Sequence, residues 1–443
     1  MTDTRTANAI ERRFDLVARG STIPRELMAG LTSFLAAAYL VIVIPSLLSA
    51  GGMNHGAVTA ATILVIAAGS VAMGLYANLP FIVGPGIGGS VILGVTLAQV
   101  DHVPWPVGLG IAFLSGLAFV ILTLTGARSV VVRMVPPQIK LGLGAAIGLF
   151  IAMVGCRDAG MIAVNAKSNA LALGDFSQPG VIAALIGLTV AVTMQARKVP
   201  GALLSGIVAA AIVGIPLGLT RLPAAPLAAP ASIGPVAFSL DVPGAITLAA
   251  LPYLFAFFVA EFFSTLGTTL SVGANAGLTD ADGNLPHIER PFLVDAFAAT
   301  LGPLVGVPAG TALVESAAGV QAGGRSGLTA IAAGACFAAT LALTPLAMAI
   351  PKQATASALI LTGVSMLASI RHLQGDGPTD VLPAMTMVLI TLISNSFGTG
   401  IAAGILVHVA VQILAGRIRQ LPLGLIILAI PLGYFFYTSA TRH

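Results

Sequence analysis

The stretches LPFIVGPGIGGS (residues 79–90) and GPLVGVPAGT (residues 302–311) are apolar segments that proline and glycine interrupt. Their proline pairs have the same spacing, at positions 80 and 85 and at positions 303 and 308, and the two pairs are 223 positions apart. Proline blocks a helix and glycine lets the backbone bend. The spacing therefore indicates an internal repeat with one broken helix in each half.

The composition around these stretches predicts a membrane protein. Hydrophobic residues make up 57% of the 443 residues and charged residues only 8%, with a mean hydropathy of +1.00. Soluble domains carry about 25% charged residues. A chain this poor in charge needs lipid as its main solvent, and its 51 glycines and 27 prolines are typical of transmembrane helices. Cys156 and Cys336 lie in apolar segments, so neither a disulfide nor a metal framework is expected.

The apolar runs predict fourteen membrane spans. They are residues 27–48, 57–77, 80–99, 104–125, 130–155, 179–195, 199–219, 246–272, 290–306, 309–322, 327–348, 352–370, 380–395 and 397–416. A further apolar stretch, Leu421 to Tyr437, could span the bilayer or lie in its interface, and we favour the interface. The Pro- and Ala-rich segment 220–244 separates seven spans from seven and predicts the boundary between the repeats.

The basic residues predict a cytoplasmic N-terminus. With that orientation the inner side carries Arg5, Arg12, Arg13, Arg19, Arg25, Arg128, Arg133, Lys140, Arg197, Lys198, Arg290, Arg325, Arg371, Arg417 and Arg419, and the outer side carries Arg157, Lys167, Arg221 and Lys352. This distribution follows the positive-inside rule. Fourteen spans also return the C-terminus to the cytoplasm, as expected for a multi-pass protein of a bacterial-type inner membrane.

The two broken segments predict a substrate site. Broken backbone at membrane depth is tolerated where it is buried in protein or lines a cavity, and a helix that restarts there offers free N–H groups to anionic or acceptor groups. Paired interruptions in two halves are typical of the binding site of a secondary transporter. We therefore expect Gly86 and Ile87, and Gly310 and Thr311, to bind substrate. The alternative is two structural helices with kinks.

Three carboxylates fall within the apolar runs, at Glu261, Asp295 and Glu315. A charge near the bilayer centre costs about 2.5–3.5 kcal/mol on insertion scales, so such residues usually serve a site, a proton relay or a hydrogen bond between helices. Glu315 closely follows Thr311 and should face the cavity. Glu261 lies in the middle of its span. We expect both to bind substrate and to couple protons; the alternative for each is a structural hydrogen bond, which is the favoured role of Asp295.

Other residue types give weaker indications. Phe81 and Tyr39 are candidates for contact with a planar ligand, and Arg325 reads as a helix cap. The sequence contains no Walker motif, no Ser-His-Asp arrangement and no Cys/His cluster with metal-ligand spacing. It therefore predicts neither an enzyme nor ATP-driven transport, and no cofactor, metal or nucleic-acid partner.

Several motifs resemble the nucleobase–ascorbate transporter superfamily, and within it the AzgA-like purine permeases. The matching segments are AGLTSFL (29–35) with Tyr39 and Pro45, AT (61–62), GPGIG (84–88), TLGT (265–268), VESAAGV (314–320) and GGRSGLT (323–329). The last two are the most specific. The matches run from the first expected span to the eleventh, and so cover both halves.

The resemblance implies an all-α, UraA-like membrane fold of two inverted seven-span repeats, with short strands in spans 3 and 10. The expected domains are a cytoplasmic N-terminus (1–25), core spans 1–4 (26–125), gate spans 5–7 (126–220), an extracytoplasmic linker (221–244), core spans 8–11 (245–349), gate spans 12–14 (350–416) and a C-terminal interfacial segment (417–443). It also implies a homodimer in the lipid bilayer, an elevator movement of the core, and proton symport of a purine-like nucleobase through Glu261 and Glu315.

Three positions depart from the family pattern. The second acid usual on span 8 is Ser264, which we still expect to contact substrate, as we do Phe81. The usual Asn before Pro45 is Ile44, and an Asn-Ala pair of span 3 is Gly89-Ser90. Each change removes a polar group from the expected site. Another small planar or anionic substrate, such as an organic anion, sulfate or bicarbonate, is therefore an open alternative. A channel or a non-transporting sensor is a third hypothesis, against which the repeat and the membrane carboxylates argue.

Overall fold

The computed structural model describes residues 9–126, 136–164, 171–279, 285–368, 371, 378–394, 396–417 and 421–440. Several basic residues used for the orientation fall outside these ranges: Arg5, Arg128, Arg133, Lys167 and Arg419. The first six residues of the expected span 130–155 fall outside them as well. The cytoplasmic placement of the N-terminus therefore stays a prediction.

One group of elements surrounds a small central sheet, and we call it the strand group. Its first part comprises α2 (Ile23–Ala37), α3 (Leu40–Ala50), α4 (His55–Ala72), η1 (Met73–Ala77), β1 (Val83–Pro85), α5 (Ile87–Val91), η2 (Ile92–Val100) and α6 (Trp105–Leu124). Its second part comprises η3 (Leu248–Ala250), α12 (Leu251–Asn275), α13 (Glu289–Val305), β4 (Gly310–Ala312), α14 (Ser316–Gln321), α15 (Gly327–Ala339), η4 (Thr340–Leu343) and α16 (Thr344–Met348). Contacts such as α6 with α13, and α2 and α4 with α15, join the two parts.

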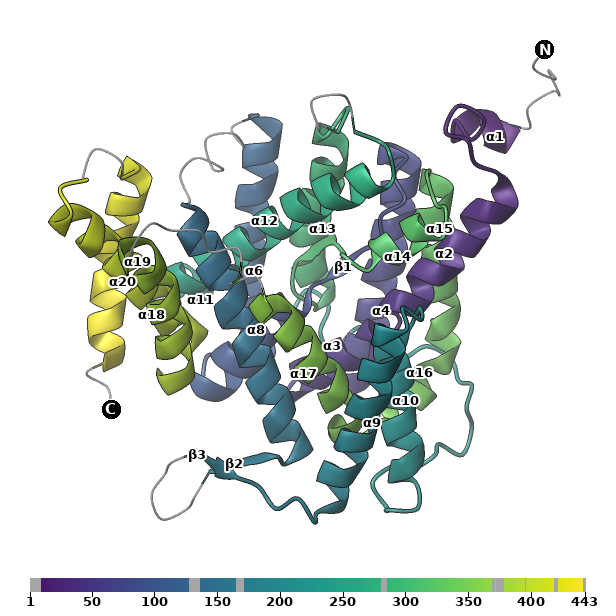
Figure 1. The fold of residues 1–443 in the computed structure, drawn as a ribbon, viewed down its shortest axis with the longest axis horizontal. Coiled ribbons are helices and arrows are strands. Elements are labelled where there is room, and N and C mark those ends of the chain that lie inside the picture. Colours follow the sequence, from purple (N-terminus) through teal and green to yellow (C-terminus); the bar gives the residue numbers. More distant parts are fainter. Residues whose placement is uncertain are drawn as a thin grey trace.

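The remaining long helices form a second set, which we call the flanking group. It comprises α8 (Pro137–Ala159), α9 (Pro179–Ala196), α10 (Ala202–Gly214), α17 (Lys352–Leu367), α18 (Pro378–Ser394), α19 (Phe397–Leu414) and α20 (Leu423–Ala440). The α8 helix packs closely against α17 and α18, and α20 packs along α19. Figure 1 shows α18, α19 and α20 at one side of the molecule, α2 and α15 at the other, and β1 near the middle.

Eight helices among the described residues are long and apolar enough to cross a membrane. Four shorter apolar helices accompany them, at Ile87–Val100, Ala202–Gly214, Val381–Ser394 and Leu423–Thr438. A helix satisfies its own backbone hydrogen bonds, which a lipid environment requires. The prediction of a multi-pass helical membrane protein is therefore confirmed.

The strands β1 and β4 lie in the two stretches that proline and glycine interrupt, and they pair antiparallel. Val83 lies opposite Ala312, Gly84 opposite Thr311 and Pro85 opposite Gly310. All six residues are buried. Because proline disfavours helical backbone in the residue before it, the chain is extended here. Each strand supplies the backbone partners that the other lacks, which buried N–H and C=O groups require.

Serine side chains fix the crossing of the two strands. The N–H of Ile82 donates to Ser316 Oγ (2.9 Å), and the hydroxyl of Ser316 donates to the carbonyl oxygen of Leu313 (2.6 Å). The N–H of Leu313 in turn donates to the carbonyl oxygen of Ile82 (2.9 Å). On the far side of β1, the N–H of Val83 donates to Ser70 Oγ (3.1 Å). These bonds hold the two distant segments in one register.

The structure corrects one detail of the proline interpretation. Pro85 ends β1, and α5 begins two residues later; Pro308 precedes β4, and α14 begins only at Ser316. Pro303 lies inside the last turn of α13, which ends at Val305 and is followed by Gly306 in a left-handed conformation (φ +96°). The two proline pairs therefore occupy different structural positions. The strand, and not the proline spacing, is what the two stretches share.

The end of α2 nearest the N-terminus is tied to the loop before α15. Buried Glu26 accepts hydrogen bonds from the N–H groups of Arg325 (3.0 Å) and Ser326 (3.2 Å) and from the hydroxyl of Thr329 (2.5 Å). The guanidinium of Arg325 donates to the carbonyl oxygens of Val320 (2.7 Å) and Gly324 (2.8 Å). Because the carbonyl of Val320 lies in the last turn of α14 (Ser316–Gln321), the prediction that Arg325 caps a helix is confirmed.

The close contact between α2 and α14 depends on Gly319. A methyl group at this position would lie 1.9 Å from Ser33 Oγ and 2.6 Å from the carbonyl oxygen of Ala29. We expect Gly319→Ala to lower the free energy of unfolding by about 1–3 kcal/mol, because the helices would have to separate. Thermal unfolding in detergent measures the change. Gly267→Ala is the matched control, since nothing lies within 4 Å of its added methyl group; equal melting temperatures for the two variants would contradict the prediction.

Candidate functional site

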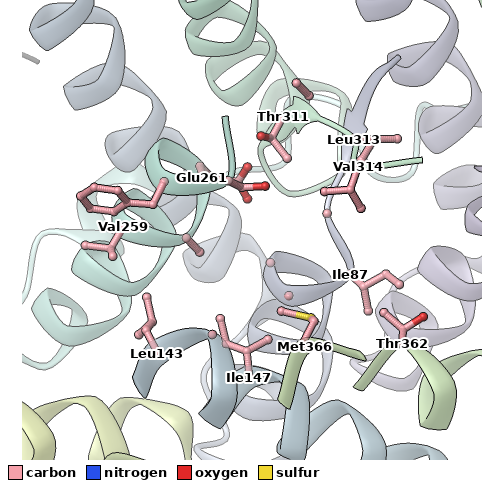
Figure 2. Close-up of a pocket in the computed structure, with 18 of the residues that line it drawn as sticks. Ile87, Leu143, Ile147, Val259, Glu261, Thr311, Leu313, Val314, Thr362 and Met366 are labelled. Carbon is pink, nitrogen blue, oxygen red and sulfur yellow. The ribbon is translucent and has the colours of Figure 1, made fainter. Parts of the chain in front are cut away.

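A cavity of about 360 Å³ lies where the strand group meets the flanking group. Ligand pockets usually measure about 300–1,000 Å³. The strand group contributes Tyr39, Leu40, Gly86, Ile87, Gly88, Gly89, Val259, Ala260, Glu261, Phe263, Ser264, Thr311, Ala312, Leu313, Val314 and Glu315 to its wall. The flanking group contributes Lys140, Leu143, Gly144, Ile147, Thr362 and Met366. Figure 2 shows Glu261 and Thr311 on one side, with Leu143, Ile147 and Met366 facing them.

Glu261 is the most unusual group in the wall. It is carried by α12 and is only 4% exposed, and its Oε2 atom has no hydrogen-bond partner among the residues that the structure describes. The other oxygen faces the start of α5: methyl groups added at Gly86 and Gly89 would lie 3.9 Å and 3.3 Å from Oε1. A buried acceptor without a partner costs about 1–3 kcal/mol or more. The carboxylate therefore has an unused binding capacity that points to a ligand.

Glu315 lies just before α14 and lines the same cavity. Its Oε1 atom accepts a hydrogen bond from the hydroxyl of Tyr39 (2.7 Å). Tyr39 sits at the short interruption between α2 and α3 and also lines the cavity. Three separate elements thus bring two carboxylates and a phenol to one wall.

Asp295 is buried next to the residues that line the cavity and holds two of their neighbouring segments together. Its Oδ2 atom accepts hydrogen bonds from the hydroxyl of Thr265 (2.8 Å) and from the N–H of Ala312 in β4 (2.8 Å). Thr265 also lies 3.0 Å from the hydroxyl oxygen of Thr311, which faces the cavity. The side chain of Asp295 is fully buried and does not line the cavity. It therefore positions β4 against α12 and α13, which is the structural role favoured for it.

The flanking group adds residues that the sequence analysis did not select. Leu143, Gly144 and Ile147 recur at helical spacing on α8, and Thr362 and Met366 do so on α17. Spacing alone cannot tell a face that lines a cavity from a face that packs in the core. In the sequence, Lys140 contributes only to the predicted membrane orientation, although a cation at the start of an apolar helix is also a signal for a site. Its Nζ atom lies 4.2 Å from the centre of the Phe263 ring.

Six of the eight residues expected to bind substrate line the cavity: Glu315, Glu261, Gly86, Ile87, Thr311 and Ser264. The structure does not bring Phe81 or Gly310 to it. Phe81 is 0% exposed and packs in an apolar cluster with Val83, because residues two apart on an extended chain face the same side. Gly310 faces α13, where an added methyl group would lie 3.0 Å from Ala298 Cβ.

The three departures from the family pattern have different places. Ser264 and Gly89 line the cavity, whereas Ile44 is fully buried in the core and does not. A methyl group at Gly89 would come within 3.3 Å of Glu261. The glycine therefore leaves space in front of the carboxylate, and a larger side chain there would compete with a ligand for it.

A second, larger hollow of about 760 Å³ lies between α4 and α13. Its lining is almost wholly apolar, and Tyr76 is its main polar member. It lacks the converging polar groups that orient a ligand. Within the described ranges, no group of three or more His, Cys, Asp or Glu residues is arranged to hold a metal ion. The cavity beside Glu261 is therefore the better candidate for a substrate site.

Comparisons with known proteins identify the family of the chain. Residues 24–407 match the model of the Permease family. The guanine/hypoxanthine permease GhxP of Escherichia coli O157:H7 is 34% identical over 437 residues, which cover 98% of this chain and 97% of that protein. The adenine permease AdeP of Escherichia coli K12 is 33% identical over 429 residues, which cover 97% and 96%.

Solved structures show the same fold at low sequence identity. The transmembrane domain of the cyanobacterial bicarbonate transporter BicA superposes with a TM-score of 0.63 at 15% identity, over 86% of this chain and 97% of that one. The murine anion transporter Slc26a9 gives a TM-score of 0.61 at 13% identity, over 95% and 74%. Because the family model and the relatives span nearly the whole sequence, the chain belongs to the nucleobase–ascorbate transporter family of permeases.

Proposed function

We propose that this protein is a secondary transporter that carries a purine-like nucleobase in symport with protons. The observation that supports it most directly is the unpartnered Oε2 atom of buried Glu261 at the cavity wall. A purine carries ring N–H groups that can supply the missing donor. The names of the relatives, which are permeases for guanine, hypoxanthine and adenine, support the same class of substrate.

The cavity suits a flat heterocycle with polar edges. Glu261 and Thr311 offer hydrogen-bonding groups, and Val259, Ile147 and Met366 offer apolar surface for the faces of the ring (Figure 2). Glu315 adds a further polar group to the lining. Small-molecule sites commonly combine a mostly apolar lining with a few placed polar groups. In this proposal Glu261 accepts from ring N–H groups, and Glu315 is held in place by Tyr39.

Proton coupling follows from the cost of burying charge. A carboxylate out of water must pair with a donor or take up a proton. In symport the proton has to bind together with the substrate, so we propose that Glu261 takes up a proton and then donates to an acceptor nitrogen of the ring, while its other oxygen accepts from a ring N–H. Substrate and proton would leave together, and water in the open cavity would solvate the ionised carboxylate that remains. Glu315 keeps its bond from Tyr39 and serves in this proposal as the second member of the pair.

The proposed movement is that of an elevator. The strand group would be the core domain, which carries the substrate, and the flanking group the gate domain, through which two copies would form a homodimer. We further propose that the chain crosses a bacterial-type inner membrane fourteen times as two inverted seven-span repeats, with both termini cytoplasmic and with Leu421–Tyr437 in the interface. The position of the cavity between the two groups supports this division.

A polar contact joins the two groups away from the cavity. The hydroxyl of Tyr253 on α12 donates to Asp101, which follows η2, and lies 3.3 Å from Ser396 Oγ, just before α19. The Tyr253 ring also packs edge-to-face on Phe435 of α20, with 6.1 Å between ring centres. If the strand group moves past the flanking group, this contact must open. We call Asp101, Tyr253 and Ser396 the latch.

Uptake into vesicles tests the transport function. The purified chain in liposomes should accumulate radiolabelled hypoxanthine, guanine or adenine when the proton gradient points inward, and an imposed sodium gradient alone should not drive it. Accumulation should stop when a protonophore collapses the gradient. Vesicles that take up sulfate or bicarbonate, and none of the three purines above the level of empty vesicles, would contradict the proposal.

Glu261→Gln should reduce nucleobase uptake by about 10- to 100-fold under an inward gradient of about one to two pH units, because the amide cannot carry the coupled proton and loses about 1.4 kcal/mol of driving force per pH unit. The amide cannot take up a proton, so the remaining uptake should also lose its dependence on the proton gradient. Initial uptake rates at several external pH values measure both effects.

The matched control for this variant is Glu289→Gln, because Glu289 begins α13 with a side chain that is 60% exposed. Its uptake should equal that of the wild type. Glu315→Gln should fall between the two, since the amide can still accept from Tyr39. Wild-type uptake and pH dependence in Glu261→Gln would assign that residue a structural role only.

Tyr253→Phe should weaken the latch while it keeps the packing of the ring. Loss of about 1 kcal/mol would change the ratio of the two transport conformations about fivefold. A cysteine at Thr362, in a background with Cys156 and Cys336 replaced by serine, reports access to the cavity. An impermeant thiol reagent added on the side of the membrane nearest Asp101 should label this cysteine faster in Tyr253→Phe than in the protein with Tyr253. Tyr434→Phe, at a tyrosine that is 60% exposed, is the control, and equal labelling in the two variants would argue against a latch.

A further inference from the structure

The hollow of about 760 Å³ between α4 and α13 shares no lining residue with the substrate cavity, and we call it the α4–α13 groove. On α4 and the adjoining η1 its lining runs from Leu64 to Tyr76, and on α13 it runs from Leu293 to Val305. Each run is about 18 Å long, at 1.5 Å per helical residue. Half of the hydrocarbon core of a bilayer is about 15 Å thick. The groove therefore has the length of one lipid leaflet.

The lining of the groove is open on the outside of the protein. Leu64 is 39% exposed, Phe297 is 47% exposed and Leu301 is 54% exposed. These side chains belong to helices that lipid surrounds, so hydrocarbon chains cover them. A chain that lies between two helices contacts protein on more than one side, and each added atomic contact contributes a small attraction. The shape of the groove therefore favours one lipid chain held in a fixed place.

Phe238 lines the groove at the C-terminal end of α13. Its N–H donates to the carbonyl oxygen of Leu304 (2.7 Å), which fixes this position. The backbone of Phe238 is left-handed (φ +54°), a conformation that a bulky residue rarely adopts, and the side chain is 77% exposed. Strain of this kind persists where the surroundings compensate for it. A hydrocarbon chain in the groove would cover the ring and provide that compensation.

Two arginines lie at the opposite end of the groove, where η1 packs against α13. Arg13 ends α1 (Ala9–Arg13), and its guanidinium donates to the carbonyl oxygen of Leu75 (2.6 Å), next to Tyr76. Arg290 lies three residues before Leu293, which places it on the groove side of α13. Both arginines are exposed. A guanidinium carries five N–H donors, and the bond to Leu75 uses one of them.

The acidic residues beside these arginines have other partners. Glu289 Oε1 lies 3.3 Å from Nδ1 of His287, and Asp15 interacts with the guanidinium of Arg19. The end of the groove at Tyr76 therefore combines an apolar channel with two guanidinium groups. A molecule that matches it has a hydrocarbon chain and an anionic group at one end.

We propose that the α4–α13 groove binds one anionic phospholipid, with an acyl chain between the helices and the phosphate at Arg13 and Arg290. Guanidinium groups bind phosphate oxygens through paired N–H donors. The predicted orientation places this end of the groove on the cytoplasmic side, where anionic lipids attract basic residues. Because α4 and α13 both belong to the strand group, the lipid would stay with that group. The proposal does not depend on which substrate is transported.

Native mass spectrometry of the purified full chain in detergent tests the choice of headgroup. The probes are phosphatidylglycerol and phosphatidylcholine with identical acyl chains. We expect one tight phosphatidylglycerol site with a Kd about tenfold lower than that of phosphatidylcholine, because hydrogen bonds to charged groups are at stake. The double variant Arg13→Gln, Arg290→Gln should bind both lipids equally, and its glutamine at position 13 can still donate to Leu75. Arg197→Gln, at an exposed arginine between α9 and α10, should keep the preference.

Ala68→Trp tests the place of the acyl chain, because Ala68 is exposed and lines the groove. The indole should weaken phosphatidylglycerol binding about tenfold, since it displaces methylene groups from the groove. The matched control is Ala335→Trp, at an exposed alanine of α15, and it should bind as the wild type does. Melting temperatures verify that each variant is folded.

A phosphatidylglycerol with a photoreactive diazirine in one acyl chain locates the site directly, and it should crosslink to residues of α4 and α13. Crosslinks that avoid both helices, equal affinities of the wild type for the two lipids, or equal lipid binding by Ala68→Trp and Ala335→Trp would overturn the proposal. Nucleobase uptake, measured separately in liposomes, tests the transport function and not this site.

Discussion

The structure depends on the need to pair backbone hydrogen-bonding groups that lie away from water. Two chain segments more than 200 residues apart break their helices in the interior, and each would leave N–H and C=O groups without partners. Antiparallel pairing of β1 with β4 supplies those partners, and Ser70 and Ser316 supply two more. This crossing fixes where α5 and α14 begin. It thereby fixes the places of Gly86, Thr311 and Glu315 in the wall of the cavity.

Glu261 and Asp295 show how local partners give one chemical group two roles. Asp295 uses one oxygen to bind the hydroxyl of Thr265 and the backbone of β4, so it stabilises the site from behind. Each residue also has one buried oxygen without a hydrogen-bond partner among the described residues, Oδ1 of Asp295 and Oε2 of Glu261. Only Glu261 lines the cavity, so only its unpartnered oxygen is available to a ligand or a proton that enters there. The fold keeps the two within one network around α12.

The site belongs to neither helix group alone. Carboxylates and strand backbone come from the strand group, while the ammonium of Lys140 and most of the facing apolar surface come from the flanking group. A bound substrate would therefore connect the two groups, and its release would let them move relative to each other. The latch of Asp101, Tyr253 and Ser396 connects the same two groups elsewhere. In the proposed mechanism, substrate binding and conformational change would thus act on one interface.

The sequence by itself determined that the chain lies in lipid and is helical, because these properties depend on composition. It also located the two interrupted segments, from the backbone chemistry of proline and glycine, and the carboxylates within the apolar runs. It also contains the motifs that place the chain in its family. Only the tertiary structure decided which residues meet. The extended chain turned Phe81 into the core and Gly310 toward α13, and the packing of α8 brought Lys140 into the cavity. Helical spacing looks the same for a face that packs and a face that lines a cavity, so such positions depend on contacts between distant segments.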